Sequence, residues 1–210
     1  MRSWSRVARW LPVDEQEDGF GWAIDEPLAR TSHALRVDGR VWLIDPVDAP
    51  ELENRIRALG EPAGVLQLLD RHARDGAAWS ARLGVPLMRA FESVAATPFD
   101  ALRVRDNRFW REVALWEPAS RTLVCADVLG TLPFFRAGDE RIGMHPLLRV
   151  APPRSLLSVA PARVLVGHGG GIHQDAATAV HDTVFNARRR IPAAVASAVR
   201  AFRSGRRSRT

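Results

Sequence analysis

The stretch VLQLLDRHARDGAAWSARLGVP, from Val65 to Pro86, decides how the rest of the chain is interpreted. It opens with the mainly apolar run Val65 to Leu69, which is typical of a buried strand. It closes with a helical pattern from Ala77 to Leu83, which ends at Gly84. Between the two lie five polar residues: Asp70, Arg71, His72, Arg74 and Asp75. This polar turn follows the carboxyl end of a strand, where α/β proteins usually hold ligands.

The segment before this stretch predicts a hairpin and a helix. Thr31 to Pro46 contains two apolar runs joined by Asp38-Gly39, a strong local signal for a β-hairpin. The second strand ends at Asp45. Glu51 to Leu59 has the apolar spacing of a helix and is closed by a glycine.

The segment after it predicts strands that also end in polar residues. Glu112 to Trp116 and Thr122 to Cys125 read as strands joined by a turn, and Asp127 follows the second strand. A short strand from Arg163 to Val166 leads directly into Gly167-His168-Gly169. The other expected elements are a strand over 101–104, an irregular segment over 138–161, and helices over about 175–190 and 193–202.

This layout resembles the metallo-β-lactamase superfamily, whose first metal motif reads His-x-His-x-Asp-His and is followed by a helix. The resemblance covers about residues 30 to 185. It places Asp70, His72, Arg74 and Asp75 on the four named motif positions, Asp127 on the bridging aspartate and His168 on the histidine of the last motif. The resemblance implies an α/β fold, a four-layer αββα sandwich with two mixed sheets face to face and helices outside.

The match in layout is better than the match in ligands. The candidate metal ligands are Asp70, His72, Asp75, Asp127 and His168, all of which can bind a divalent cation. Arg74 stands where the family has an aspartate, and Arg108 stands near the slot of a further histidine. Arginine stays protonated and has no lone pair to donate, so the resemblance implies a degenerate metal centre.

Three interpretations of the pocket remain open. In the first, which we favour slightly, the pocket is metal-free, and Arg74 and Arg108 replace the metal charge and bind an anionic small molecule or a partner. In the second, one divalent metal (zinc, iron or manganese) is held by Asp75, Asp127 and His168 with help from Asp70 or His72. The activity implied is then hydrolysis of an ester, thioester, lactone, amide or phosphodiester. In the third, these are ordinary turn residues.

Composition sets the remaining limits. The chain has 210 residues, and its 46% apolar and 26% charged content is ordinary for one globular domain. We expect this domain over residues 1–203 and a disordered basic tail over 204–210. The single cysteine, Cys125, excludes an internal disulfide and reads as a core residue. With no signal-peptide pattern and no membrane-length apolar run, we expect a cytoplasmic protein that does not bind membranes.

The two ends of the chain give weaker signals. Helical spacing from Met1 to Leu11 predicts a helix, and Asp14 to Gly19 an acidic loop. All 30 basic residues are arginines and the net charge is +6. Eight of these arginines lie in residues 186–210, which contain no acid. That segment could contact nucleic acid, although a solvated basic end is the simpler interpretation. The other histidines, His33, His145, His173 and His181, read as structural or surface residues.

Overall fold

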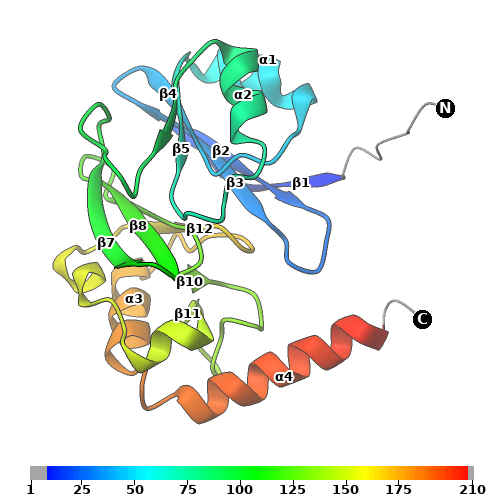
Figure 1. Cartoon of the computed structure of the whole chain (residues 1–210), viewed down its shortest axis with the longest axis vertical. Coiled ribbons are helices and arrows are strands. Elements are labelled where there is room, and N and C mark those ends of the chain that lie inside the picture. The colour runs from blue at the N-terminus through cyan, green and yellow to red at the C-terminus, as the bar shows by residue number, and fades with distance from the viewer. Residues whose placement is uncertain (1–8, 208–210) are drawn as a thin grey trace.

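The computed structural model describes residues 9–207 of the chain, with side chains up to residue 201. Its amino-terminal half is a six-stranded sheet in which each strand pairs with the next along the chain (Figure 1). The strands are β1 (Trp10–Gln16), β2 (Gly19–Ile24), β3 (Thr31–Val37), β4 (Arg40–Ile44), β5 (Glu61–Gln67) and β6 (Leu87–Arg89). β1 to β4 are antiparallel, whereas β4, β5 and β6 run parallel.

Two helices cross over on this sheet, as parallel strand connections require. The short 3-10 helix η1 (Pro50–Leu52) leads into α1 (Glu53–Leu59), and α2 (Gly76–Leu83) joins β5 to β6. Both α-helices contact β5. Their apolar faces and one face of the sheet form a compact cluster that includes Ile56 and Trp79, both fully buried.

The carboxyl-terminal half contains a second sheet, in the order β12-β9-β8-β7. Its strands are β7 (Asp100–Asn107), β8 (Trp110–Glu117), β9 (Thr122–Cys125) and β12 (Arg163–Val166), of which β9 and β12 run parallel. The pair β10 (Leu129–Gly130) and β11 (Gly143–Met144) follows β9, before the 3-10 helices η2 (Pro146–Val150) and η3 (Arg154–Ser158). The last helices are α3 (Ala176–Phe185) and α4 (Ile191–Arg207).

The larger core lies between the two sheets and continues to α3. It joins side chains of the first sheet, such as Ile44 and Leu66, to Leu115 and Val124 of the second and Val180 of α3. Layers of helix, sheet, sheet and helix therefore follow one another through the molecule (Figure 1). This arrangement confirms the predicted four-layer sandwich.

The predicted hairpin, the helix after it, and the strand, turn and helix of residues 65–84 are all present. The amino-terminal prediction is wrong where it can be checked. Leu11 and Asp14 lie in strand β1, which pairs with β2 at the sheet edge, while residues 1–8 of the expected helix lie outside the described residues. Pro12 is tolerated because an edge strand leaves one row of backbone groups unpaired. The "acidic loop" is thus mainly strand, and only residues 17 and 18 form the turn.

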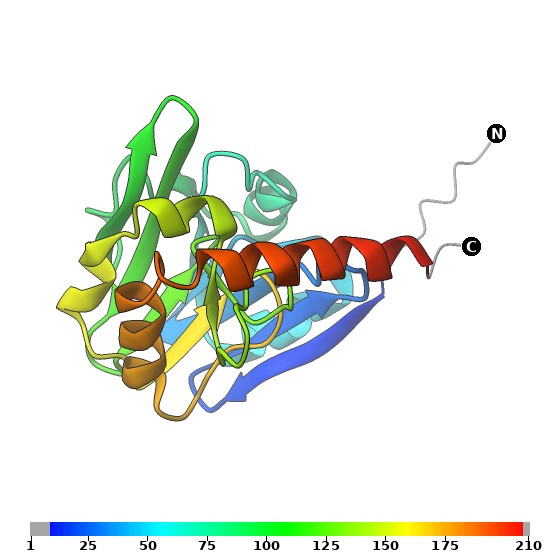
Figure 2. The ribbon, with the colours of Figure 1, turned by 90° about the horizontal axis from the view of Figure 1, so that it is seen from below.

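The carboxyl end also differs from the prediction. Helix α4 continues through Arg207, so residues 204–207 are helical rather than a disordered tail, while residues 208–210 are not described. Figure 2 shows α4 extending past the edge of the sheets. Among the described residues no helix is both long and apolar enough to cross a membrane.

An ion pair joins the two halves of the sandwich and gives a first prediction. Arg163 of β12 donates through both terminal nitrogens to Asp18 of the β1–β2 turn, with Nη1 2.7 Å from Oδ1. The arginine lowers the pKa of Asp18, so the stabilisation is present above the ordinary value of 3.8 and is lost as the pH falls through the lowered value. Asp18→Asn should therefore lower the free energy of unfolding by about 1 kcal/mol at pH 7.

Denaturant unfolding at pH 7 and pH 3 checks this pair. The difference between wild type and Asp18→Asn should shrink at the lower pH. The control is Asp38→Asn, at an exposed turn, which should change stability by less than about 0.5 kcal/mol. A difference that persists unchanged at pH 3 would contradict the assigned ion pair.

Candidate metal site

Three polar side chains from three different loops meet between the sheets. His72 follows β5, Asp127 follows β9 and His168 follows β12. The Nε2 atoms of His72 and His168 each lie 3.0 Å from the same oxygen, Oδ1 of Asp127. Each of the three residues presents one ligand atom, and these atoms lie within 4.8 Å of one another. The three side chains are 10%, 16% and 11% exposed respectively, so the group is almost enclosed but still accessible from one side.

A second layer of contacts fixes how the two imidazoles point. His72 Nδ1 lies 3.0 Å from Oδ2 of Asp45, and His168 Nδ1 lies 2.7 Å from the carbonyl oxygen of Leu28. A carbonyl only accepts hydrogen bonds, so His168 carries its proton on Nδ1 and turns Nε2 toward Asp127. Histidines that bind metals are usually oriented in this way, by a carboxylate or a backbone carbonyl on the other ring nitrogen.

The oxygen at the centre of the group has no hydrogen-bond donor. Oδ1 of Asp127 is buried and has no hydrogen-bond partner among the described residues; its two polar neighbours are the Nε2 atoms of His72 and His168. Two imidazole nitrogens and a carboxylate oxygen that face one another need a positive charge between them, either a proton or a cation. This donor set, two histidines and one aspartate, is one that zinc, iron and manganese accept. The residues present therefore fit a single divalent metal ion.

The pKa values around the group have the same cause. Burial lowers the pKa of His72, but the carboxylates of Asp127 and Asp45 outweigh burial and raise it to about 9. Burial raises the pKa of Asp127, whereas the two histidines lower it more strongly, to well below its usual range. At pH 7 without metal, His72 is therefore protonated and Asp127 ionised. A metal ion has to replace that proton in order to bind.

Asp45 links this site to the first sheet. Its Oδ1 accepts a hydrogen bond from the backbone N–H of Leu68 at 2.9 Å, which leaves Oδ2 for His72. Its backbone adopts a left-handed conformation, with φ of 43°, although it precedes Pro46. Such backbone conformations cost energy for a non-glycine residue and cluster at functional sites. From the sequence, Asp45 is predicted only as the end of a strand; its role as the partner of His72 depends on the fold.

Glu112 holds the turn that carries Asp127. It is fully buried in β8, and its Oε1 accepts the backbone N–H groups of Asp127 and Val128 at 2.9 and 2.8 Å. Its Oε2 accepts the indole N–H of Trp110 at 2.6 Å. Burial, and then the charge of Asp127, raise its pKa to about 8. Sequence reasoning did not identify Glu112; the available signal was a carboxylate at the start of the apolar run Val113 to Trp116.

Aromatic side chains lie beside the metal group. The ring of Phe135 stacks on His168 with centroids 5.7 Å apart, and the ring of Trp110 contacts His145 at 4.9 Å. Burial lowers the pKa of His145 to about 4, so its imidazole is neutral at pH 7 and does not repel a cation. The sequence analysis had placed His145 among the structural or surface histidines, and its partly buried position beside the group was not predicted.

The other predicted site residues lie elsewhere. Asp70 is exposed and lies beside Arg71, 3.5 Å from its Nε. Asp75 precedes α2 and accepts the backbone N–H of Asp48 through Oδ2 at 2.8 Å. Neither belongs to the group of His72, Asp127 and His168. The structure thus brings together three of the five candidate ligands.

Arg74 and Arg108 form no ion pair with Asp70, Asp75 or Asp127 among the described residues. The Arg74 guanidinium donates to three backbone carbonyls: Thr31 at 2.5 Å, Asp45 at 2.8 Å and Gly167 at 3.1 Å. It ties the ends of both sheets together beside the group.

Arg108 lies at the exposed tip of the β7–β8 hairpin, with its guanidinium carbon 4.3 Å from the ring centroid of Phe109. The hairpin turn is tight because Asn107 Oδ1 accepts the N–H groups of Phe109 and Trp110. Arg108 therefore points away from the position in which the resemblance had placed it.

Comparisons with solved structures agree with this architecture. The chain is similar to the DIM-1 metallo-β-lactamase, with a TM-score of 0.57 and 14% identity over 87% of this chain and all of that one. The chain has the metallo-β-lactamase fold. It is also similar to the BLEG-1 B3 metallo-β-lactamase, with a TM-score of 0.51 and 15% identity over 84% of this chain and 98% of that one. No protein-family profile matches the chain, and no curated protein matches it.

The geometry predicts how metal affinity responds to substitution. Asp127→Ala and His168→Ala each remove a ligand and should weaken zinc binding by at least about 100-fold. Asp45→Asn removes the charge that orients His72 and should weaken zinc binding about 10- to 100-fold. Competition with a chromophoric chelator measures these affinities. Asp70→Asn is the matched control and should bind zinc like wild type. Equal losses in Asp70→Asn and Asp127→Ala would contradict the assignment of the three ligands.

The two arginines should behave in opposite ways. Arg74→Met removes the donor from three carbonyls inside the molecule and should lower the free energy of unfolding by about 3 kcal/mol or more. Arg108→Ala removes only an exposed stacking contact and should lower it by less than about 0.5 kcal/mol. Urea unfolding measures both. A small effect of Arg74→Met would show that these hydrogen bonds do not hold the sheet ends together.

Proposed function

We propose that this protein is a single-metal hydrolase of uncharged carbonyl substrates, namely an ester, thioester or lactone. One observation carries the proposal: the Nε2 atoms of His72 and His168 both lie 3.0 Å from the buried Oδ1 of Asp127, and these three ligand atoms are within 4.8 Å of one another. His72, Asp127 and His168 would hold the ion. A divalent cation supplies Lewis-acid activation of a water molecule and of the scissile carbonyl.

The chain's own residues position and shield that chemistry. Asp45 and the Leu28 carbonyl orient the two imidazoles, and Glu112 fixes the backbone of the turn that carries Asp127. Trp110, Phe135 and the neutral His145 surround the group with aromatic surface. Such a wall limits access of water and offers apolar contact for an acyl group.

The surrounding charges favour a neutral substrate over a phosphodiester. The two terminal nitrogens of Arg74 donate to backbone carbonyls, and Arg71 donates to the Phe109 carbonyl and lies beside Asp70. Arg108 stacks on Phe109 at the exposed tip of the β7–β8 hairpin. The same facts weaken our first interpretation, in which Arg74 and Arg108 bind an anion in a metal-free pocket.

A metal-reconstitution assay tests this function. Protein stripped with a chelator and reloaded with zinc, iron(II) or manganese should hydrolyse p-nitrophenyl acetate or members of a thioester and lactone panel, and should lose at least about 100-fold of kcat in Asp127→Asn. Asp70→Asn is the control and should retain activity. Circular dichroism establishes that each variant is folded. Hydrolysis that is indifferent to the metal, or equal in wild type and Asp127→Asn, would overturn the proposal.

A further inference from the structure

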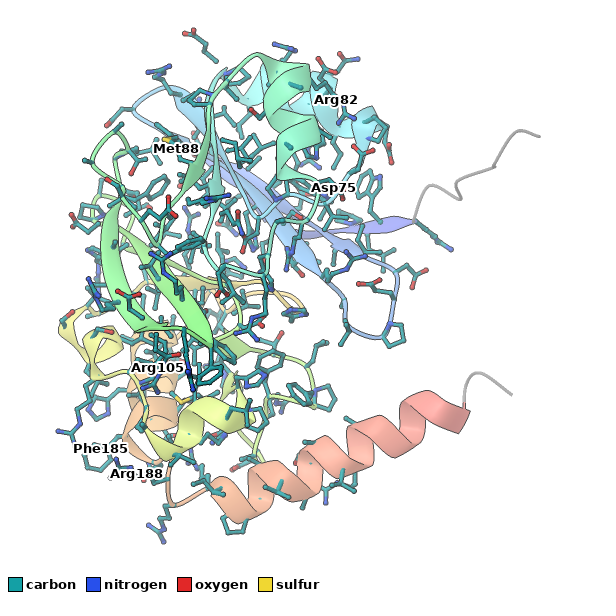
Figure 3. All side chains as sticks on the ribbon, in the orientation of Figure 1. Asp75, Arg82, Met88, Arg105, Phe185 and Arg188 are labelled. Carbon is teal, nitrogen blue, oxygen red and sulfur yellow. The ribbon has the colours of Figure 1, made fainter. Side chains whose placement is uncertain are left out.

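A cavity of about 670 Å³ lies among β7, η3 and α3, and none of its lining residues belongs to the metal group. Arg105 comes from β7, Arg154 and Leu157 from η3, and Phe185 from the end of α3. Arg188 follows α3 and completes one wall. In Figure 3 the labelled side chains of Arg105, Phe185 and Arg188 gather on the same side of the molecule. The volume is within the range of small-molecule sites.

The cavity carries positive charge that no acid offsets. Three arginines line it and no aspartate or glutamate does. Arg105 Nη2 donates to the carbonyl of Ala151 at 2.7 Å, and Arg188 Nε donates to the carbonyl of Val150 at 2.8 Å. Bonds to consecutive carbonyls hold two guanidinium groups near each other. Among the side chains that the structure describes, residues 9–201, no carboxylate lies within ion-pair distance of Arg105, Arg154 or Arg188.

This arrangement favours an anion with several oxygens. Each guanidinium has five N–H donors, of which these backbone bonds use only one apiece. Like charges held together without a counter-charge repel, and a bound anion removes that repulsion. Arginine forks match phosphate oxygens in a bidentate geometry, so a phosphate-bearing ligand fits better than a single carboxylate.

A flat aromatic platform stands on the same wall. His181 and Phe185, one turn apart on α3, stack with centroids 5.6 Å apart and an interplanar angle of 12°. Phe185 remains 73% exposed, which is unusual for so large an apolar side chain. An exposed aromatic face beside arginines is the combination that proteins use to stack a nucleobase next to its phosphates.

We propose that this cavity binds a nucleotide, with the phosphates on Arg105, Arg154 and Arg188 and the base on the ring of Phe185. The nucleotide is either free or one unit of a single-stranded nucleic acid; the two share this chemistry. The site is separate from the metal group, and its occupancy does not depend on the proposed hydrolase activity.

Fluorescence or calorimetric titration of the full chain tests the site with four probes: ADP, adenosine, inorganic pyrophosphate and a 12-nucleotide single-stranded RNA. ADP should bind at least tenfold more tightly than adenosine or pyrophosphate, because it engages both the arginines and the ring. Arg105→Ala combined with Arg188→Ala should weaken ADP binding at least tenfold. Phe185→Ala should weaken ADP binding several-fold and leave pyrophosphate binding unchanged.

The control is a variant that loses the same number of positive charges on a different surface. Arg57→Ala combined with Arg89→Ala removes two exposed arginines from the first sheet region and should leave ADP binding within twofold of wild type. RNA that binds more tightly than ADP and is weakened by the same variants identifies the source as a nucleic-acid strand; RNA that binds no better identifies a free nucleotide. Absence of ADP binding, equal binding of pyrophosphate and ADP, or an equal loss in the control pair would overturn the proposal.

Discussion

The candidate site depends on one electrostatic requirement. Three electron-pair donors, from the loops after three strands, face a common point, and a proton or a cation must lie between them. His72, Asp127 and His168 reach this point because the loops after β5, β9 and β12 end at the same edge of the sandwich. Oδ1 of Asp127 is buried, so solvent cannot supply this charge. Without metal the proton on His72 supplies it, and a divalent ion binds only by displacing that proton.

The supporting contacts serve the same requirement. Asp45 orients the imidazole of His72, and the carbonyl of Leu28 orients that of His168. Glu112 fixes the backbone of the turn that carries Asp127. Arg74 adds a fixed positive charge where the family pattern has a further metal-binding aspartate, and uses its donors to join the ends of the two sheets. The repulsion between a guanidinium and a nearby dication costs roughly several kcal/mol, even at an effective dielectric constant of about 20. One metal ion is therefore compatible with this pocket, and a pair of metal ions is disfavoured.

Much of the fold could be read from the sequence because its decisive signals are local. The Asp38-Gly39 turn predicted the hairpin. The apolar runs before His72, Asp127 and His168 predicted three strands, and these strands end at the site. Those signals depend on periodicity and turn chemistry, which single segments carry. The sandwich and the meeting of these three residues followed from the family resemblance.

What the sequence could not give depends on contacts between distant segments. The partnership of Asp45 with His72 spans 27 residues, and that of His168 with the Leu28 carbonyl spans 140. Arg108 and Arg74 looked equivalent as charges in ligand slots, yet a tight turn exposes one while the other bonds three carbonyls. Edge strand β1 was missed because pairing with β2 overrode a weak helical spacing.

Anomalous X-ray diffraction at the zinc edge, from crystals grown with zinc, would show whether these three residues bind one metal ion. We expect one strong peak within about 2.0–2.3 Å of His72 Nε2, Asp127 Oδ1 and His168 Nε2. A map with no peak among these three atoms, or with two peaks of equal height in the pocket, would contradict it.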